Sequence, residues 1–284
     1  MSETTRGERA ASTASWLIRI AVVMHVLGIV ATVFARRGTS IGNVGLMEWG
    51  WTHDRIFLVE RWAAVALLGV ALSLIVRPTV AAAVVVSATV LAEVTGAYRF
   101  GGSFFVEWSH ATQILRYLAP LALIPLIAAP RFQPNAPWRF SSSAWILRVG
   151  IAVVFAAHGA QALYHDPHFI DLIIGSTRRL TGFRPSEAQA VAILLPIGIV
   201  DVTVAALLLV GRWKLLLGWM CFWGLLTACS RVTANGLMSY PEVLLRASHY
   251  LAPAAIWALA GYGVPVSAAQ RQSSLPAPAA IDIK

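Results

Sequence analysis

Charged side chains are scarce in this sequence. Only 12% of the 284 residues are Asp, Glu, Lys or Arg, whereas soluble domains carry roughly 25%. Hydrophobic residues make up 58% of the chain and the mean hydropathy is +0.70. Too few polar side chains are present to cover a surface that faces water. The composition therefore excludes a water-soluble globule and predicts an integral membrane protein whose surface contacts the lipid bilayer.

Cysteines and signature motifs are scarce as well. Cys221 and Cys229 lie in one apolar stretch, about 12 Å apart along a helix, which is too far for a disulfide. Lys and Arg outnumber Asp and Glu by 22 to 13, but no basic run exceeds two residues, so no nucleic-acid partner is predicted. The sequence has no Walker loop, dinucleotide-binding glycine turn, zinc-protease motif, nucleophile elbow or Cys-x-x-Cys. Hydrolytic, ATP-driven and dithiol chemistries thus have no motif to support them, and no metal site is predicted.

Long apolar windows dominate what remains. A bilayer core needs about 20 apolar residues per helix, and eight windows reach this length to within a turn: 16–34, 56–76, 79–98, 111–129, 145–163, 188–210, 213–233 and 244–261. The organisation predicted from them is a polar N-terminal segment (1–15), a first four-helix repeat (16–129), a linker (130–144), a second four-helix repeat (145–261) and a flexible C-terminal tail (262–284).

An internal repeat relates the two halves. The sequence Tyr117-Leu118-Ala119-Pro120 recurs 133 residues later as Tyr250-Leu251-Ala252-Pro253. His25 and His158 share this offset, while Glu60 and Asp201 differ by 141 because the second half has a longer loop. An even number of helices per copy gives both copies the same direction through the membrane. The predicted fold is an all-α integral membrane protein with eight transmembrane helices, arranged as two parallel-repeat four-helix bundles.

Ionisable residues inside the windows collect at one end of the bundle. The end that carries the N-terminus is called side A, and the opposite end, with the longer loops, side B. Apart from Arg19, Arg148 and Arg61, which can reach the headgroups from near the helix ends, the ionisable residues fall in the side-B half or near the middle. Those in the side-B half are Glu60, Glu93, Arg116, His158, Arg231, Arg246 and His249, and those near the middle are His25 and Asp201. Because charges facing lipid are costly, we expect these side chains to face one another around a shared cavity.

Two pairs of these residues are candidates for chemistry. His25 and His158 could hydrogen-bond a quinone head group or carry protons, ligate a haem or metal, or form structural contacts. Glu60 and Asp201 each need a partner in the membrane, and the candidate cations include Arg116, Arg246, Arg99 and Arg231. These carboxylates could either tie helices together as buried ion pairs or exchange protons with a ligand.

The second half, about residues 145–260, resembles the DoxX-like membrane proteins. The similarity rests on Arg148-Val149-Gly150, Phe155, His158-Gly159, Gly182-Phe183-Arg184-Pro185, Asp201 and Gly211-Arg212. The first half keeps His25, Glu60 and Gly69 but lacks the glycine after the histidine. Gln161 and Asp201 depart from the family pattern, since Lys and Glu are expected in those regions.

The resemblance implies a doubled four-helix unit in a family whose relatives include a subunit of thiosulfate:quinone oxidoreductase. It marks His158 and Asp201 as the conspicuous polar positions, with His25 and Glu60 as their counterparts in the first repeat.

The leading functional hypothesis is a redox-associated, quinone-interacting membrane protein. In it, His158, Asp201, His25 and Glu60 handle protons, as catalytic residues would. The ligand-binding field is set by five further residues: Arg116, Arg246, His249, Glu93 and Arg231. The sequence leaves the cofactor open, and a quinone and a haem are the two candidates.

The rival hypotheses are a non-catalytic accessory subunit of a larger respiratory or photosynthetic complex, and a small proton-coupled transporter. The expected location is the bacterial inner membrane, with both termini in the cytoplasm. The distribution of basic residues is nearly even between the two sides, so this orientation rests on the shorter basic turns of side A.

Overall fold

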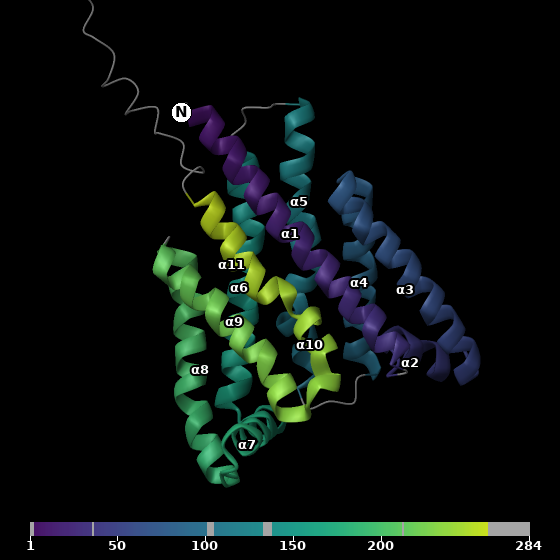
Figure 1. Cartoon of the computed structure of the whole chain (residues 1–284), viewed down its shortest axis with the longest axis vertical. Helices are drawn as coiled ribbons and strands as arrows, with labels where there is room; N and C mark the ends of the chain where they lie inside the picture. The colour runs from purple at the N-terminus through teal and green to yellow at the C-terminus, as the bar shows by residue number, and fades with distance from the viewer. Residues whose placement is uncertain (1–2, 36, 101–104, 133–137, 212, 261–284) are drawn as a thin grey trace, which may run out of the picture.

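The computed structural model describes residues 3–35, 37–100, 105–132, 138–211 and 213–260. In these residues helices are the only regular secondary structure (Figure 1). In chain order the helices are α1 (Glu3–Phe34), α2 (Ser40–Met47), α3 (His53–Val76), α4 (Val80–Phe100), η1 (Val106–Trp108), α5 (Ser109–Phe132), α6 (Trp138–Leu163), α7 (Pro167–Thr181), α8 (Glu187–Val210), α9 (Lys214–Asn235), η2 (Leu237–Ser239), α10 (Tyr240–Leu245) and α11 (Ala247–Leu259).

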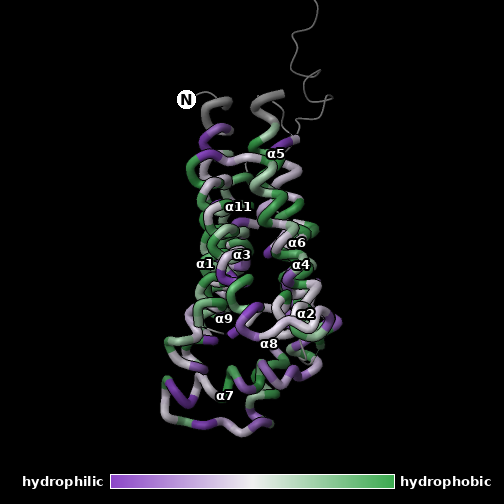
Figure 2. The backbone as a smooth tube through the Cα atoms, turned by 90° about the vertical axis from the view of Figure 1, so that its right-hand side faces the viewer, coloured by the Kyte–Doolittle hydropathy of each residue, from purple (hydrophilic) through white to green (hydrophobic). Residues whose placement is uncertain are grey.

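Seven of these helices, within the described residues, are long and apolar enough to cross a membrane: α1, α3, α4, α5 with η1, α6, α8 and α9. They correspond to the first seven apolar windows. Each has an 18-residue stretch of mean hydropathy between 1.4 and 2.6, which matches the length and polarity of a bilayer core. In Figure 2 hydrophobic residues dominate the long helices, and hydrophilic residues are frequent at the lower end, around α7. The all-α prediction is confirmed for the described residues, and their seven long apolar helices are compatible with the predicted integral membrane protein.

The eighth window, 244–261, is not one long helix. It is interrupted at Arg246, which separates the six-residue α10 from the 13-residue α11. Thirteen residues give about 20 Å of helix, short of the ~30 Å hydrocarbon core. At the interruption the Arg246 side chain makes polar interactions. Its guanidinium donates to the Glu242 backbone carbonyl at 3.1 Å and pairs with the Glu242 carboxylate. An uninterrupted eighth span is therefore not confirmed.

Short helices occupy the side-B connections, at the bottom of Figure 1. Helix α7 begins where the Asp166 carboxylate accepts the His168 N–H at 2.9 Å, and it ends at Gly182, whose φ of 76° suits a residue without a side chain. Helix α2 is capped by Thr39, whose hydroxyl accepts the Gly42 N–H at 3.1 Å. The long side-B connections predicted from the sequence are thus folded segments that close the lower end of the bundle.

The two halves pack along a continuous apolar core. Its largest fully buried members are concentrated near the side-A ends of their helices: Ile18, Leu74, Leu123, Leu147, Leu208, Leu217 and Leu259. Helix α1 packs on α3, α5 and α11, and α6 packs on α5, α8 and α11. These side chains fill much of the side-A half, where the buried polar residues include Arg139, Ser143 and Arg148.

The predicted end segments join this framework in different ways. The polar N-terminal segment is helical from Glu3 and continuous with α1, and Glu8 pairs with the buried Arg139 at the start of α6. The predicted linker is largely helical too, since α5 continues to Phe132 and α6 begins at Trp138. The tail at 262–284 lies outside the described residues.

Candidate functional site

Two separate cavities open in the side-B half of the bundle. The first-half cavity has a volume of about 210 Å³ and lies between α1, α2, α4 and α5, with Leu245 on its wall. The second-half cavity has a volume of about 400 Å³ and lies between α6, α7, α8, α9 and the start of α11. The predicted polar residues are divided between them: His25, Glu93 and Arg116 line the first, and His158, Asp201, Arg231, Arg246 and His249 line the second. Glu60 lines neither. A single shared cavity was therefore a wrong prediction.

The carboxylates of the first half hold helix α2. Glu93 of α4 accepts the backbone N–H groups of Ser40 and Ile41 at 2.7 and 3.1 Å. Glu60 of α3 accepts the Thr39 N–H at 2.8 Å and the Thr39 hydroxyl at 2.5 Å. The first backbone donors of a helix have no partner within the helix, and a negative charge beside them is favourable. Both acids thus fix a loop helix against the spans.

The expected ion pairs of Glu60 and Asp201 with arginine do not form among the described residues. For Glu60 the reason is local, because the Thr39 backbone and hydroxyl reach its carboxylate first. Asp201 has no such loop beside it. Of the candidate cations, Arg99 pairs with Glu48 on the surface at 3.5 Å, and Arg246 pairs with Glu242.

Replacing Glu93 with alanine is expected to loosen α2. The N–H groups of Ser40 and Ile41 would lose their acceptor, and an unsatisfied buried donor costs about 1–3 kcal/mol. Trypsin should then cleave after the exposed Arg37 several-fold faster, as followed by mass spectrometry of the fragments. The exposed carboxylate of Glu107 provides the matched control, and Glu107→Ala should leave the cleavage rate unchanged. Equal cleavage rates in the wild type and Glu93→Ala would contradict this role.

Histidines mark the inner wall of each cavity. The His25 ring is 5% exposed and its Nδ1 donates to the Leu245 carbonyl at 2.8 Å. The His158 Nδ1 lies 3.1 Å from the Gln161 side-chain oxygen, and the His158 ring lies 6.1 Å from that of His249. The two equivalent histidines thus have different partners in different cavities. They do not form the pair that ligation of one haem or metal would require.

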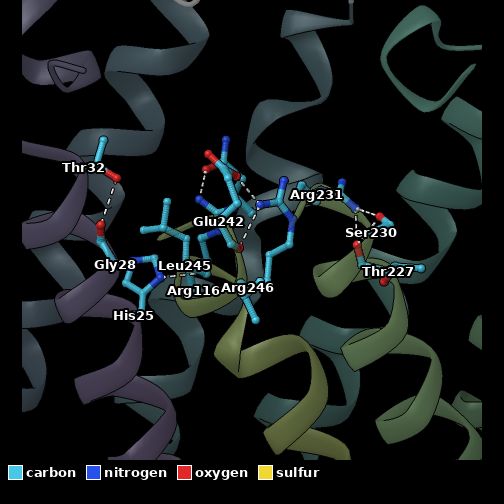
Figure 3. Close-up of polar contacts among 12 residues, drawn as sticks. His25, Gly28, Thr32, Arg116, Thr227, Ser230, Arg231, Glu242, Leu245 and Arg246 are labelled. Atoms are coloured by element: carbon cyan, nitrogen blue, oxygen red, sulfur yellow. Dashed lines mark hydrogen bonds and ion pairs between the residues drawn. The ribbon is translucent and has the colours of Figure 1, made fainter. Parts of the chain in front are cut away.

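Three arginines gather between the cavities. Figure 3 shows His25 on α1, Arg116 and Arg246 near the centre and Arg231 on α9 in one row. Arg116 donates to the Gln113 side chain at 2.8 Å, while Arg231 donates to the Thr227 carbonyl at 2.5 Å and to the Ser230 hydroxyl at 3.3 Å. The Nε atoms of Arg116 and Arg231 are buried and have no hydrogen-bond partner among the described residues.

Glu242 supplies negative charge to this group. Its helix, α10, lies at the side-B end, and its carboxylate pairs with Arg246. Burial raises the pKa of Glu242, but the charge and hydrogen bond of Arg246 and the charges of Arg116 and Arg231 outweigh it and bring the pKa to about 2. Glu242 therefore stays ionised at neutral pH and partly offsets the three arginines.

The second-half cavity combines apolar walls with unsatisfied polar groups. Its apolar walls include Phe155, Leu172, Ile193, Ile197 and Leu226. Four of its lining residues carry a buried polar atom that makes no hydrogen bond of normal geometry among the described residues, Asp201 Oδ1, Trp223 Nε1, Arg231 Nε and His249 Nε2, and of these the Trp223 indole lies beside the Asp201 carboxylate. Asp201 and His249 are only 6% and 5% exposed. Native proteins satisfy nearly all buried polar groups, so this concentration indicates a place for a bound molecule.

Trp223 was missed in the sequence. It lies at the centre of its apolar window, whereas indole rings of membrane proteins favour the headgroup layer at helix ends. Its central position indicates a functional or packing role, because a buried indole N–H needs a hydrogen-bond acceptor. Glu242 was not predicted because it lies two residues before the eighth apolar window, which begins at Leu244.

No family model matches the chain, and the searches of curated proteins and of solved structures return no match.

Proposed function

We propose that this protein binds a quinone within the membrane, in the second-half cavity. The observation that carries the proposal is the set of four buried polar atoms without a hydrogen bond of normal geometry on the walls of one otherwise apolar cavity. A site of this kind, apolar with a few convergent polar groups, suits a small amphiphilic ring. The volume of about 400 Å³ falls within the range of ligand pockets.

These polar groups suit both redox forms of the ligand. Quinone carbonyl oxygens accept hydrogen bonds, and Trp223 Nε1 and Arg231 Nε can donate them, as can His249 Nε2 in the tautomer that carries its hydrogen there. A quinol also donates from its hydroxyl groups, and the Asp201 Oδ1 atom can accept such a bond. Asp201 and His158, on the same walls, are the groups that would exchange protons with the head group.

We also propose that the two halves of the chain are copies of one four-helix unit. The helices α1, α3, α4 and α5 correspond in order to α6, α8, α9 and α10–α11, and the short helices α2 and α7 fill the same side-B connection. In each half the first helix packs on the second, the fourth on the third, and the short helix on the third. This supports two four-helix copies, with α10–α11 as an interrupted eighth crossing, as in the DoxX-like proteins that the second half resembles.

In this arrangement the polar residues of the first copy would hold neighbouring segments of the protein together and would not bind a ligand. Arg116 directly precedes the first Tyr-Leu-Ala-Pro sequence, at the position where His249 precedes the second. The Glu60 carboxylate, the counterpart of Asp201, already accepts a hydrogen bond from Thr39. The membrane would be the bacterial inner membrane, with side A towards the cytoplasm.

The binding test uses tryptophan fluorescence, which a quinone quenches at short range. The purified protein in lipid nanodiscs is titrated with decylubiquinone, and saturable quenching is expected. Trp223→Phe should remove most of this signal, whereas Trp257→Phe, at a tryptophan that does not line the cavity, should not. Arg231→Gln should weaken binding about 10- to 100-fold, since a hydrogen bond from a charged donor contributes about 1.5–3 kcal/mol.

The absence of saturable quenching, or quenching that Trp223→Phe and Arg231→Gln leave unchanged, would overturn the proposal. The accessory-subunit prediction would then gain support if the protein co-purified with larger membrane partners. The transporter prediction would gain support from proton-coupled uptake into liposomes that Asp201→Asn abolishes.

A further inference from the structure

The second-half cavity is open towards the surrounding lipid on one side. Helices α8 and α9 barely contact each other, although both contribute to its wall. Ile193 of α8 and Leu226 of α9 line the cavity and yet are 44% and 46% exposed on the outer surface of the protein. Both lie within membrane-spanning helices. The surface that they expose therefore faces acyl chains, and the gap between them connects the cavity with the bilayer.

Helix α7 forms a fixed floor below this gap. Ser176 hydrogen-bonds to the Ser230 carbonyl at 3.2 Å and lies 2.8 Å from the Thr233 hydroxyl of α9. Phe169, Leu172 and Ile173 of α7 face the cavity, whereas Arg178 and Arg179 near its end are exposed. This division of apolar and basic residues is typical of a helix that lies in the membrane interface. Helix α7 thus lies between much of the cavity and side B, and the opening bordered by Ile193 and Leu226 is apolar.

The two histidines lie at the far side of the cavity from the gap, whereas Asp201 of α8 and Trp223 and Arg231 of α9 belong to the helices that border it. His158 comes from α6 and His249 from α11, the helices behind α8 and α9, and Arg246 precedes α11. A head group bound to them would leave any attached chain directed between Ile193 and Leu226. The opening thus selects ligands that have a chain as well as a ring.

From this geometry we infer that the cavity takes its ligand sideways from the side-B leaflet, between α8 and α9, and that the ligand is a chain-bearing amphiphile whose chain stays in the gap. This inference rests on the proposed function for the nature of the head group. The route itself rests only on the arrangement of α7, α8 and α9.

Narrowing the gap tests the chain requirement. The double variant Ile193→Phe with Leu226→Phe adds bulk on both sides of the opening. The control Ile199→Phe with Leu225→Phe adds the same bulk to exposed positions of the same helices that do not line the cavity. We expect the gap variant to bind decylubiquinone at least about tenfold more weakly, while the dimethoxy-methyl-benzoquinone ring without a chain binds within about twofold of wild type, because only the chain meets the added bulk. Equal effects on both ligands, or no effect on either, would overturn the lateral route.

A native cysteine tests the route without any quinone. Cys229 lines the cavity, and Cys221 can be replaced by serine to leave it as the only thiol. In liposomes, a membrane-dissolved alkyl maleimide should modify Cys229 at least about tenfold faster than a sulfonated maleimide of equal reactivity, because partitioning raises the local concentration of the apolar reagent. The gap variant should slow this reaction. Faster modification by the sulfonated reagent would show an opening to water and overturn the inference.

The two tests separate the two proposals. A wild-type protein that binds neither quinone, but shows the expected maleimide preference, would refute the quinone and support the lateral opening. A protein that binds both quinones equally well in the gap and control variants would support the quinone and refute the lateral opening.

Discussion

Replacing Asp201 with leucine is expected to stabilise the protein and to abolish quinol binding. The Asp201 Oδ1 atom is buried and makes no hydrogen bond of normal geometry among the described residues. An unsatisfied buried polar group costs about 1–3 kcal/mol, and a leucine in the centre of a span is favourable. The melting temperature should therefore rise by several degrees, as measured by heat-induced loss of the monodisperse peak in size-exclusion chromatography.

The same substitution in the first half should have the opposite effect on stability. Glu60→Leu removes the acceptor of the Thr39 N–H and hydroxyl, so it should destabilise the protein by about 1–3 kcal/mol while leaving quinol binding intact. Residues that bind ligands are often unfavourable for stability, because their polar atoms await a partner. If Asp201→Leu lowered the melting temperature as much as Glu60→Leu does, Asp201 would be a structural residue, and its assigned role at the cavity would be wrong.

The second large effect is expected at the crossing of α6 and α8. A Cβ atom on Gly198 would lie 2.7 Å from the Gly159 carbonyl oxygen and 2.8 Å from the Leu163 side chain. The carbonyl belongs to the backbone of α6, so relief requires the two helices to move apart. Small residues at such crossings allow close packing in membranes. Gly198→Ala is therefore expected to destabilise the protein by about 1–3 kcal/mol.

This substitution should also affect the cavity. His158 directly precedes Gly159, and Asp201 follows Gly198 by less than one turn, so separation of the helices displaces both side chains. Decylubiquinone binding should weaken by about tenfold or more, since displacement of two polar contacts costs at least ~1.4 kcal/mol. Gly69→Ala on α3 is the matched control, because a Cβ atom there meets nothing within 4 Å. It should gain about 0.5–1 kcal/mol through better helix propensity. Equal melting temperatures for the two variants would contradict the proposed close packing.

Glu60 and Asp201 have different surroundings that their sequence positions do not reveal. Both are single acids in apolar helices, at corresponding places in the two halves, and no sequence pattern distinguishes them. Their difference comes from α2, an eight-residue helix too short to appear among the apolar windows. Its N-terminal donors reach Glu60 and Glu93 only after the first three spans have packed.

Composition and spacing by themselves determined the membrane-embedded, all-helical nature of the chain, seven of its long apolar helices and the concentration of ionisable residues towards side B. These properties follow from the length of apolar runs and the cost of charge in lipid, and both are local. Only the tertiary structure decided that the polar residues surround two cavities, that the last apolar window is broken at Arg246, and which polar atoms lack partners. Those outcomes depend on which helices meet and how closely, because a buried group is satisfied or left open by neighbours that are distant in the chain.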